Sequence, residues 1–216
     1  MKTHSDILRR LIEPGVIAVI RADSSAQLMH AAEALRKGGV IAMEVTMTTP
    51  NALDVIQEVT RRHGDEIVMG VGTILDAETC RAAILAGAEF VVTPVFRPEV
   101  IQLCRRYSRP IICGAYTPTE ILSAWEAGSD FVKVFPADGL GASYIKAVKA
   151  PLPQVEIIPT GGVDVNTVED FIKAGCAAVA AGSTLVSKKI LETQNWTELT
   201  ATAKRFVEAV AKARKG

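Results

Sequence analysis

Four regularly spaced glycines constrain the fold of this 216-residue chain more than any other feature. Each of Gly39, Gly87, Gly128 and Gly175 follows a stretch with helical periodicity and precedes a run of apolar or β-branched residues. A glycine at such a junction is typical of the left-handed residue that ends a helix. The four lie 48, 41 and 47 residues apart, about twice the length of one strand-helix unit, so each interval should hold two units.

Counting the strand candidates in order supports this repeat. Eight short apolar runs stand out, at 16–20, 41–46, 67–71, 89–93, 110–114, 130–134, 155–159 and 178–181. Helix start signals lie between them, at Ser24-Ser25, Thr49-Pro50, Asp76, Thr117-Pro118-Thr119-Glu120 and Asp164. Strands that are apolar throughout and alternate with helices are typical of a parallel sheet covered by helices. The sequence therefore predicts a single (β/α)8 barrel domain over 1–216, with a doubly wound open sheet as the alternative.

The two ends of the chain complete the expected architecture. Residues 5–12 predict a short helix that precedes the first strand and caps the bottom of the barrel. The last helix should begin at Asn195, with one apolar face made of Trp196, Leu199, Ala203, Phe206 and Val210.

Charge and cysteine content argue against several classes of protein. Lys and Arg number 24 and so do Asp and Glu, so the net charge is zero and nothing favours nucleic acid or an anionic membrane. The four cysteines are far apart and lack a C-x-x-C pair, which indicates buried apolar residues in a reducing compartment. The first ten residues are polar and no apolar run approaches 18, so we expect a cytoplasmic protein.

One cation lies in the middle of an apolar strand. Lys133 shares a face of the predicted strand with Phe131 and Phe135, whereas Val132 and Val134 face the other way. Burial of an unpaired ammonium is costly, so such a lysine is held by a carboxylate or by a functional need. A lysine of this kind can act as a nucleophile.

A carboxylate lies in a second apolar strand. Glu44 would face Lys133 across the interior of a barrel. One interpretation is a buried structural ion pair. The other is a proton shuttle beside an amine nucleophile, which together would supply the parts of imine chemistry: the amine attacks a ketone, and the acid moves the protons needed for dehydration.

Polar residues gather where the predicted strands end, which is where parallel α/β folds place their active sites. Besides Lys133 and Glu44 they are Arg21, Thr46, Thr73, Thr93, Thr160, Gly161-Gly162 and Gly182-Ser183. The two glycine pairs follow the seventh and eighth strands, where backbone N–H groups at helix N-termini would bind a phosphate; turn-forming glycines are the alternative. The three histidines lie elsewhere and no nucleotide-binding motif is present, so we expect neither a metal nor a cofactor.

Several of these segments resemble one enzyme family. Glu44-Val45-Thr46, Gly70-Val71-Gly72-Thr73, Phe131-Val132-Lys133-Val134-Phe135-Pro136 and Pro159-Thr160-Gly161-Gly162, in this order, resemble the 2-keto-3-deoxy-6-phosphogluconate (KDPG) aldolases and the related 4-hydroxy-2-oxoglutarate aldolases. The likeness covers essentially the whole chain. It implies a class I aldolase, usually homotrimeric, that cleaves a phosphorylated 2-keto-3-deoxy sugar acid to pyruvate and glyceraldehyde 3-phosphate.

The resemblance also implies a role for each matching residue. The matches are Lys133 for the Schiff-base lysine, Glu44 for the general acid/base, Thr73 and Thr160 for the pyruvoyl carboxylate and substrate hydroxyls, Phe135 for the wall of the pyruvate pocket, and Gly161, Gly162, Gly182 and Ser183 for the phosphate cradle.

The chain departs from the family pattern at one position. Many members carry an arginine that helps to hold the substrate carboxylate two residues after the strand-2 threonine, and this chain has Thr48 there. Arg21 resembles the arginine of the branch that acts on the galactonate epimer, so we expect it to bind the carboxylate; pairing with Glu44 or another acid is the alternative.

The choice of substrate among the gluconate, the galactonate and 4-hydroxy-2-oxoglutarate therefore stays open. Two other functions also remain possible for this fold: a non-catalytic sugar-phosphate-binding or assembly barrel, and a phosphosugar isomerase or decarboxylase that needs no imine-forming lysine.

Overall fold

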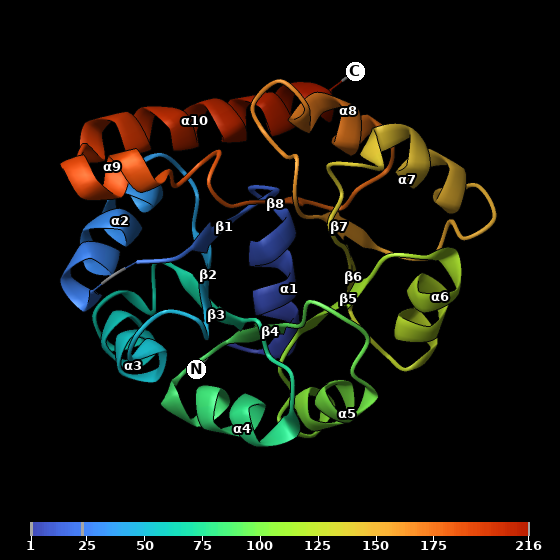
Figure 1. Cartoon of the computed structure of the whole chain (residues 1–216), viewed down its shortest axis with the longest axis horizontal. Coiled ribbons are helices and arrows are strands. Elements are labelled where there is room, and N and C mark those ends of the chain that lie inside the picture. The colour runs from blue at the N-terminus through green and yellow to red at the C-terminus, as the bar shows by residue number, and fades with distance from the viewer. Residues whose placement is uncertain (1, 23, 216) are drawn as a thin grey trace.

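A ring of helices surrounds a parallel sheet in the computed structural model, which describes residues 2–22 and 24–215 (Figure 1). The strands are β1 (Val16–Ile20), β2 (Ala42–Thr46), β3 (Val68–Gly72), β4 (Phe90–Val92), β5 (Ile111–Ala115), β6 (Phe131–Val134), β7 (Ile157–Pro159) and β8 (Val179–Ala181). The helices are α1 (His4–Ile12), α2 (Ser25–Lys37), α3 (Ala52–His63), α4 (Ala77–Ala86), α5 (Pro98–Arg106), α6 (Pro118–Glu126), α7 (Gly141–Lys149), α8 (Val168–Lys173), α9 (Lys188–Thr193) and α10 (Trp196–Ala213). Each predicted strand is confirmed to within two residues.

The sheet closes into a barrel. In the described part of the chain, the strands follow the order β7-β6-β5-β4-β3-β2-β1-β8, and every neighbouring pair is parallel. The two ends of this order, β7 and β8, meet through a bridge between Thr160 and Ala180. The Ala177 N–H also donates to the Ile157 carbonyl at 3.0 Å. The prediction of a (β/α)8 barrel is therefore confirmed, and the open-sheet alternative is wrong.

Alternate residues of each strand divide between two apolar layers, because successive side chains of a strand point to opposite faces. One cluster of buried side chains lies inside the barrel, and from the strands it includes Ile17, Val19, Ala42, Val68, Phe90, Val92, Ile112, Phe131, Ile158 and Ala180. The intervening strand residues, such as Ala18, Met43 and Val132, belong to the layer beneath the helices. This division shows which strand positions face the interior.

Helix α1 closes one end of the interior. Ile7 and Leu11 are fully buried and join the apolar cluster inside the barrel. Figure 1 shows α1 across the centre of the ring formed by the other helices. The predicted short helix at the bottom of the barrel is thus confirmed, and it leaves the opposite end, where the strands have their C-termini, as the open mouth of the barrel.

Most of the predicted helix starts are also confirmed. The side chains of Ser24, Asp76, Thr117 and Asn195 each accept a hydrogen bond from the backbone N–H three residues later. Glu120 completes the predicted capping box with Thr117. These polar groups satisfy backbone donors that the first turn of a helix leaves free.

Two helix starts differ from the prediction. α3 begins at Ala52, after Asn51 in the left-handed region (φ 54°), and not at Thr49-Pro50. α8 begins at Val168, because Asp164 Oδ1 accepts hydrogen bonds from the N–H groups of Asn166 and Thr167 and forms a turn ahead of the helix.

Two further expectations concern the state of the cysteines and the presence of membrane-spanning helices. Cys80, Cys104, Cys113 and Cys176 are all buried and none forms a disulfide, as predicted. Among the residues that the structure describes, no helix has the length and apolar character needed to cross a membrane.

Candidate active site

Lys133 lies inside the barrel on β6. Its side chain faces the interior with Phe131, and the residue is only 7% exposed. The ammonium Nζ lies 4.9 Å from the centroid of the Phe135 ring, within reach of a cation–π interaction. Within residues 2–22 and 24–215, no carboxylate lies within 4.0 Å of Nζ. The structural ion pair with Glu44, one of our two interpretations, does not form.

Glu44 faces the same interior from β2. It follows Ala42 on the inner face and is 2% exposed. Gly72 on β3 leaves the space that its carboxylate occupies, since a Cβ placed on Gly72 would overlap Glu44 Oε1 and Cδ. The Glu44 side chain forms no hydrogen bond or ion pair with another described residue, so the carboxylate is free to move a proton.

Thr73 follows β3 in a strained conformation. Its φ is 61°, in the left-handed region that a β-branched residue rarely adopts. A non-glycine residue there costs about 1–2 kcal/mol, and such strain tends to gather at functional sites. The strain therefore supports the prediction that Thr73 has a role at the mouth of the barrel.

Thr160 presents a hydroxyl without a partner. Its N–H donates to the Val134 carbonyl at 3.0 Å, and its carbonyl accepts from the Ala137 N–H at 2.9 Å. The residue is 8% exposed, and Oγ1 is buried with no hydrogen bond. A buried, unpaired hydroxyl costs about 1–3 kcal/mol, so Thr160 Oγ1 is available to hydrogen-bond a ligand.

Thr93 was a further strand-end candidate, and the structure gives it a structural role. Its Oγ1 donates to the Val95 carbonyl at 2.8 Å and accepts from the Gly114 N–H at 3.0 Å. The first bond lies within the loop after β4, and the second ties this loop to β5. Its hydroxyl is thus occupied, in contrast to that of Thr160.

The two glycine loops, 161–162 and 182–183, lie in turns and not at helix N-termini. α8 starts at Val168 and α9 at Lys188, so the predicted placement directly ahead of a helix is wrong. Gly161 and Gly162 have φ values of 93° and 67°, which other residues rarely adopt. Thr184 Oγ1 donates to the Val163 carbonyl at 2.6 Å and ties the two loops together.

Arg21 continues the inner face of β1 after Ile17 and Val19. It lines a cavity of about 250 Å³ with Ser183 of the second glycine loop and with Lys188 and Glu192, which form an ion pair at 3.5 Å. No described acid lies within 4.0 Å of its guanidinium, so the alternative that Arg21 pairs with Glu44 is wrong. The arginine is therefore available to an anion at the mouth.

Thr48 occupies the position at which the resemblance led us to expect an arginine. Its Oγ1 lies 2.8 Å from Oγ1 of Thr46, which is buried at the end of β2. This hydroxyl pair carries no charge, so it can offer an anion hydrogen bonds but no cation.

Two further residues shape this site and were not predicted from the sequence. Gly72 makes room for Glu44, and Thr184 joins the two glycine loops. Alternation of the predicted strand 67–71, continued one residue past its end, was the available signal for Gly72.

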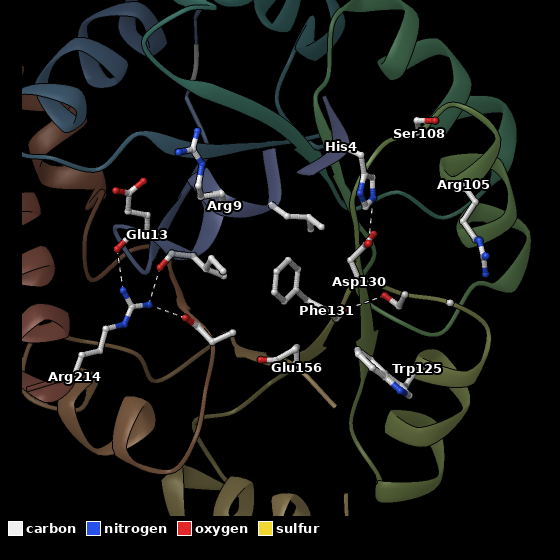
Figure 2. A pocket seen from close by; sticks show the side chains of 15 residues that line it. His4, Arg9, Glu13, Arg105, Ser108, Trp125, Asp130, Phe131, Glu156 and Arg214 are labelled. Atoms are coloured by element: carbon white, nitrogen blue, oxygen red, sulfur yellow. Dashed lines mark hydrogen bonds and ion pairs between the residues drawn. The ribbon is translucent and has the colours of Figure 1, made fainter. Parts of the chain in front are cut away.

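A large cavity, about 1180 Å³, lies at the other end of the barrel (Figure 2). Its walls come from α1 and from the segments that lead into β6, β7 and β8. His4 pairs with Asp130 at 3.1 Å, and Arg214 donates to three backbone carbonyls, including that of Glu13 at 2.8 Å. The first contact joins α1 to the segment before β6, and those of Arg214 join the C-terminal segment to the end of α1 and to the segment before β8. We place the active site at the mouth because Lys133, Glu44 and the strand ends face it, and because barrel enzymes act there.

A closed (β/α)8 barrel with an amine nucleophile and a free carboxylate in one interior defines an enzyme of the imine-forming class I aldolase type. The sequence matches the family model for KDPG and KHG aldolase over residues 7–202. The chain belongs to this aldolase family.

Individual relatives agree with this assignment. The chain is 32% identical to 2-dehydro-3-deoxy-phosphogluconate aldolase of Haemophilus influenzae, over 96% of this chain and 98% of the relative. It is 33% identical to 2-dehydro-3-deoxy-6-phosphogalactonate aldolase of Escherichia coli K12, over 79% and 83%. A crystal structure of KDPG aldolase from Legionella pneumophila, with pyruvate captured as a covalent carbinolamine, superposes with a TM-score of 0.85 at 27% identity, over 94% and 97%.

Proposed function

We propose that this chain cleaves KDPG to pyruvate and glyceraldehyde 3-phosphate through an imine on Lys133. The observation that carries the proposal is the placement of Lys133, a 7% exposed amine without an acidic partner inside a barrel of this aldolase family. The carbinolamine captured in the Legionella pneumophila relative supports the same chemistry.

The reaction begins when the unprotonated Lys133 amine attacks the C2 ketone. Glu44 supplies the proton with which the carbinolamine loses water, which leaves a protonated imine. Glu44 then removes the proton of the C4 hydroxyl, the C3–C4 bond breaks, and its electron pair moves into the imine to give an enamine and the free aldehyde. Protonation of the enamine at C3 and hydrolysis release pyruvate and restore the amine. The Glu44 carboxylate forms no hydrogen bond or ion pair with another described residue, so it can take part in both proton transfers.

The remaining residues hold the two halves of the substrate. Thr73 and Thr160 bind the pyruvoyl carboxylate and the substrate hydroxyls, and Phe135 forms a wall of the pyruvate pocket. The glycine loops bind the phosphate through their backbone N–H groups. Arg21 attracts an anion at the mouth, where Lys188 of the same cavity is already paired with Glu192.

The galactonate epimer is a second candidate substrate. Arg21 with no arginine at position 48 favours it, whereas the overall identity to one gluconate enzyme and to the galactonate enzyme of Escherichia coli K12 is equal, at 33%. 4-Hydroxy-2-oxoglutarate, which lacks the phosphate, is a third. Because the gluconate and galactonate differ only in the configuration at C4, the groups around C4 decide between them.

A pyruvate-release assay with the three keto acids tests the proposal. We expect wild-type protein to release pyruvate fastest from a phosphorylated substrate and Lys133→Met to release none above background. Wild-type protein that releases no pyruvate from any of them would contradict the proposal and favour the non-catalytic barrel. Release that survives in Lys133→Met would exclude the imine.

Membership of the same family supports our inferences on the domain organisation, oligomeric state and location of the enzyme. We infer one catalytic domain over residues 1–216, a homotrimer in solution, and a cytoplasmic location. Its partners are the keto acid and pyruvate, with no nucleic acid, membrane, metal or cofactor. Light scattering of the purified protein, with a trimer mass expected, tests the oligomeric state.

A further inference from the structure

Tyr116 directly follows β5 (Ile111–Ala115), the strand that pairs with the strand of Lys133. Ile112 belongs to the cluster inside the barrel, and Gly114 shares its face; if this alternation continues one residue past the strand, Tyr116 lies on the same side. In the register of β5 and β6, Gly114 lies beside Lys133 and Ala115 beside Val134. The next pair in this register is Tyr116 and Phe135, and the Phe135 N–H still donates to the Ala115 carbonyl at 3.1 Å.

The backbone of Tyr116 is held from two sides. Glu120 Oε2 accepts hydrogen bonds from the N–H of Tyr116 at 2.9 Å and of Thr117 at 2.8 Å. From α7, the Tyr144 hydroxyl donates to the Tyr116 carbonyl at 2.6 Å. The start of α6 and one residue of α7 thus fix the point from which the Tyr116 ring projects.

The Tyr116 side chain itself is not used by the fold. The residue is 43% exposed, and its hydroxyl forms no hydrogen bond with any described residue. A phenol offers an apolar ring and a polar tip, a combination suited to contact with a ligand. The Tyr116 ring is exposed, its backbone is fixed, and its neighbour in the register is Phe135, whose ring contacts the Lys133 ammonium. The ring is therefore placed to contact substrate and not to stabilise the fold.

We propose that Tyr116 binds the aldehyde half of the substrate and donates its hydroxyl hydrogen bond to the C4 or C5 oxygen. This inference rests on the function proposed above, which places the pyruvate half at Lys133 and Phe135. The rest of the substrate has to extend from Lys133 toward the rim, where Tyr116 lies. Because the gluconate and galactonate substrates differ at C4, Tyr116 is a specificity-determining residue.

The variant Tyr116→Phe keeps the ring and removes the hydroxyl. We expect kcat/KM for the preferred substrate to fall about tenfold, the effect of one lost hydrogen bond, and the ratio of kcat/KM between the two epimers to change. The pyruvate concentration that gives half-maximal borohydride labelling of Lys133 should stay within about twofold of wild type, because pyruvate lacks the aldehyde half.

A matched control is Tyr107→Phe. The Tyr107 hydroxyl accepts a hydrogen bond from Arg81 Nε at 3.0 Å, between α4 and α5 and away from the inner face. This variant also loses one phenolic hydroxyl, yet it should leave kcat/KM, the epimer ratio and pyruvate labelling unchanged.

The outcomes separate the two proposals. An unchanged epimer ratio and kcat/KM in Tyr116→Phe would overturn the role of Tyr116 alone. Equal losses of cleavage and pyruvate labelling would also overturn it, since they indicate a general disturbance of the site. Wild-type protein in which pyruvate never labels Lys133 would overturn the proposed function, and the role of Tyr116 with it, before any variant is made.

Discussion

At the scale of single residues, a variant of Glu44 distinguishes a catalytic role of this carboxylate from a role in stability. Because its carboxylate has no ion-pair partner among the described residues, Glu44→Gln should unfold at the same temperature as wild type. Its turnover should fall by roughly 10²–10⁴-fold, the range for loss of general acid/base assistance. Steady-state kinetics and a thermal melt measure the two effects on one sample.

The matched control is Glu89→Gln. Glu89 is also a buried carboxylate, but it pairs with Lys2 at 2.8 Å and accepts from the Met69 N–H. We expect this variant to lose thermal stability and keep its turnover. A Glu44→Gln protein that melts early, as Glu89→Gln should, would instead assign Glu44 a structural role.

Single residues also show which parts of the site could be predicted from the sequence and which could not. Lys133 and Glu44 stood out because a charge within an apolar strand is costly to bury, whatever the rest of the fold. Tyr116 gave no such signal, since an aromatic residue near the end of a strand fits a core equally well. Whether Arg21 faces an acid depends on side-chain contacts between distant segments, which a linear pattern does not contain.

At the scale of elements, the pairing of β2 with β3 positions the proposed acid. Thr46 lies beside Gly72 in the register, and Gly72 leaves the space for the Glu44 carboxylate. Gly72→Ala should push the carboxylate aside and lower kcat by roughly 100-fold, the scale of an error of about 1 Å in a catalytic group.

Gly139→Ala provides the control, because a Cβ at that glycine would meet nothing within 4 Å. It should retain wild-type kcat. Wild-type kcat in Gly72→Ala, confirmed as folded by circular dichroism, would mean that the position of Glu44 against β3 is irrelevant to turnover.

The cap of α6 predicts a dependence of stability on pH. Hydrogen bonds from the backbone N–H groups of Thr117 and Tyr116 lower the pKa of Glu120. A carboxylate whose pKa is lower in the folded state stabilises the fold above its unfolded pKa, about 4.3, and loses this contribution as the pH falls through the folded pKa.

Glu120→Gln should therefore melt below wild type at pH 7, and the difference should shrink toward pH 3. Thermal melts of both proteins across this range measure it. A difference that stays constant with pH would show that the Glu120 charge does not support the cap.

The elements were predictable where local chemistry decides them. The start of α6 follows from the spacing of Thr117 and Glu120 alone. The starts of α3 and α8 were misplaced because Asn51 in a left-handed conformation and the turn at Asp164 each insert residues before the first helical hydrogen bond. The same error put the glycine loops at helix N-termini.

At the scale of the whole molecule, the repeat of glycine junctions and the count of eight strands predicted a parallel α/β fold and favoured the barrel, because eight parallel strands with short connections have few arrangements. The open sheet stayed as an alternative, since the contact of β7 with β8 that closes the barrel joins segments far apart in the sequence. The large cavity at the other end could not be predicted. Its lining brings together α1, the approaches to three strands and Arg214 near the C-terminus, segments far apart in the sequence (Figure 2).

Reductive trapping tests the central claim, that Lys133 forms the imine. Wild-type protein is treated with pyruvate and borohydride, its intact mass is measured, and the modified peptide is sequenced; Lys133→Met is treated in parallel. We expect one pyruvate-derived group per chain, on the peptide that holds Lys133, and no addition to Lys133→Met. A label on a different lysine, or folded wild-type protein that takes up no label at saturating pyruvate, would contradict it.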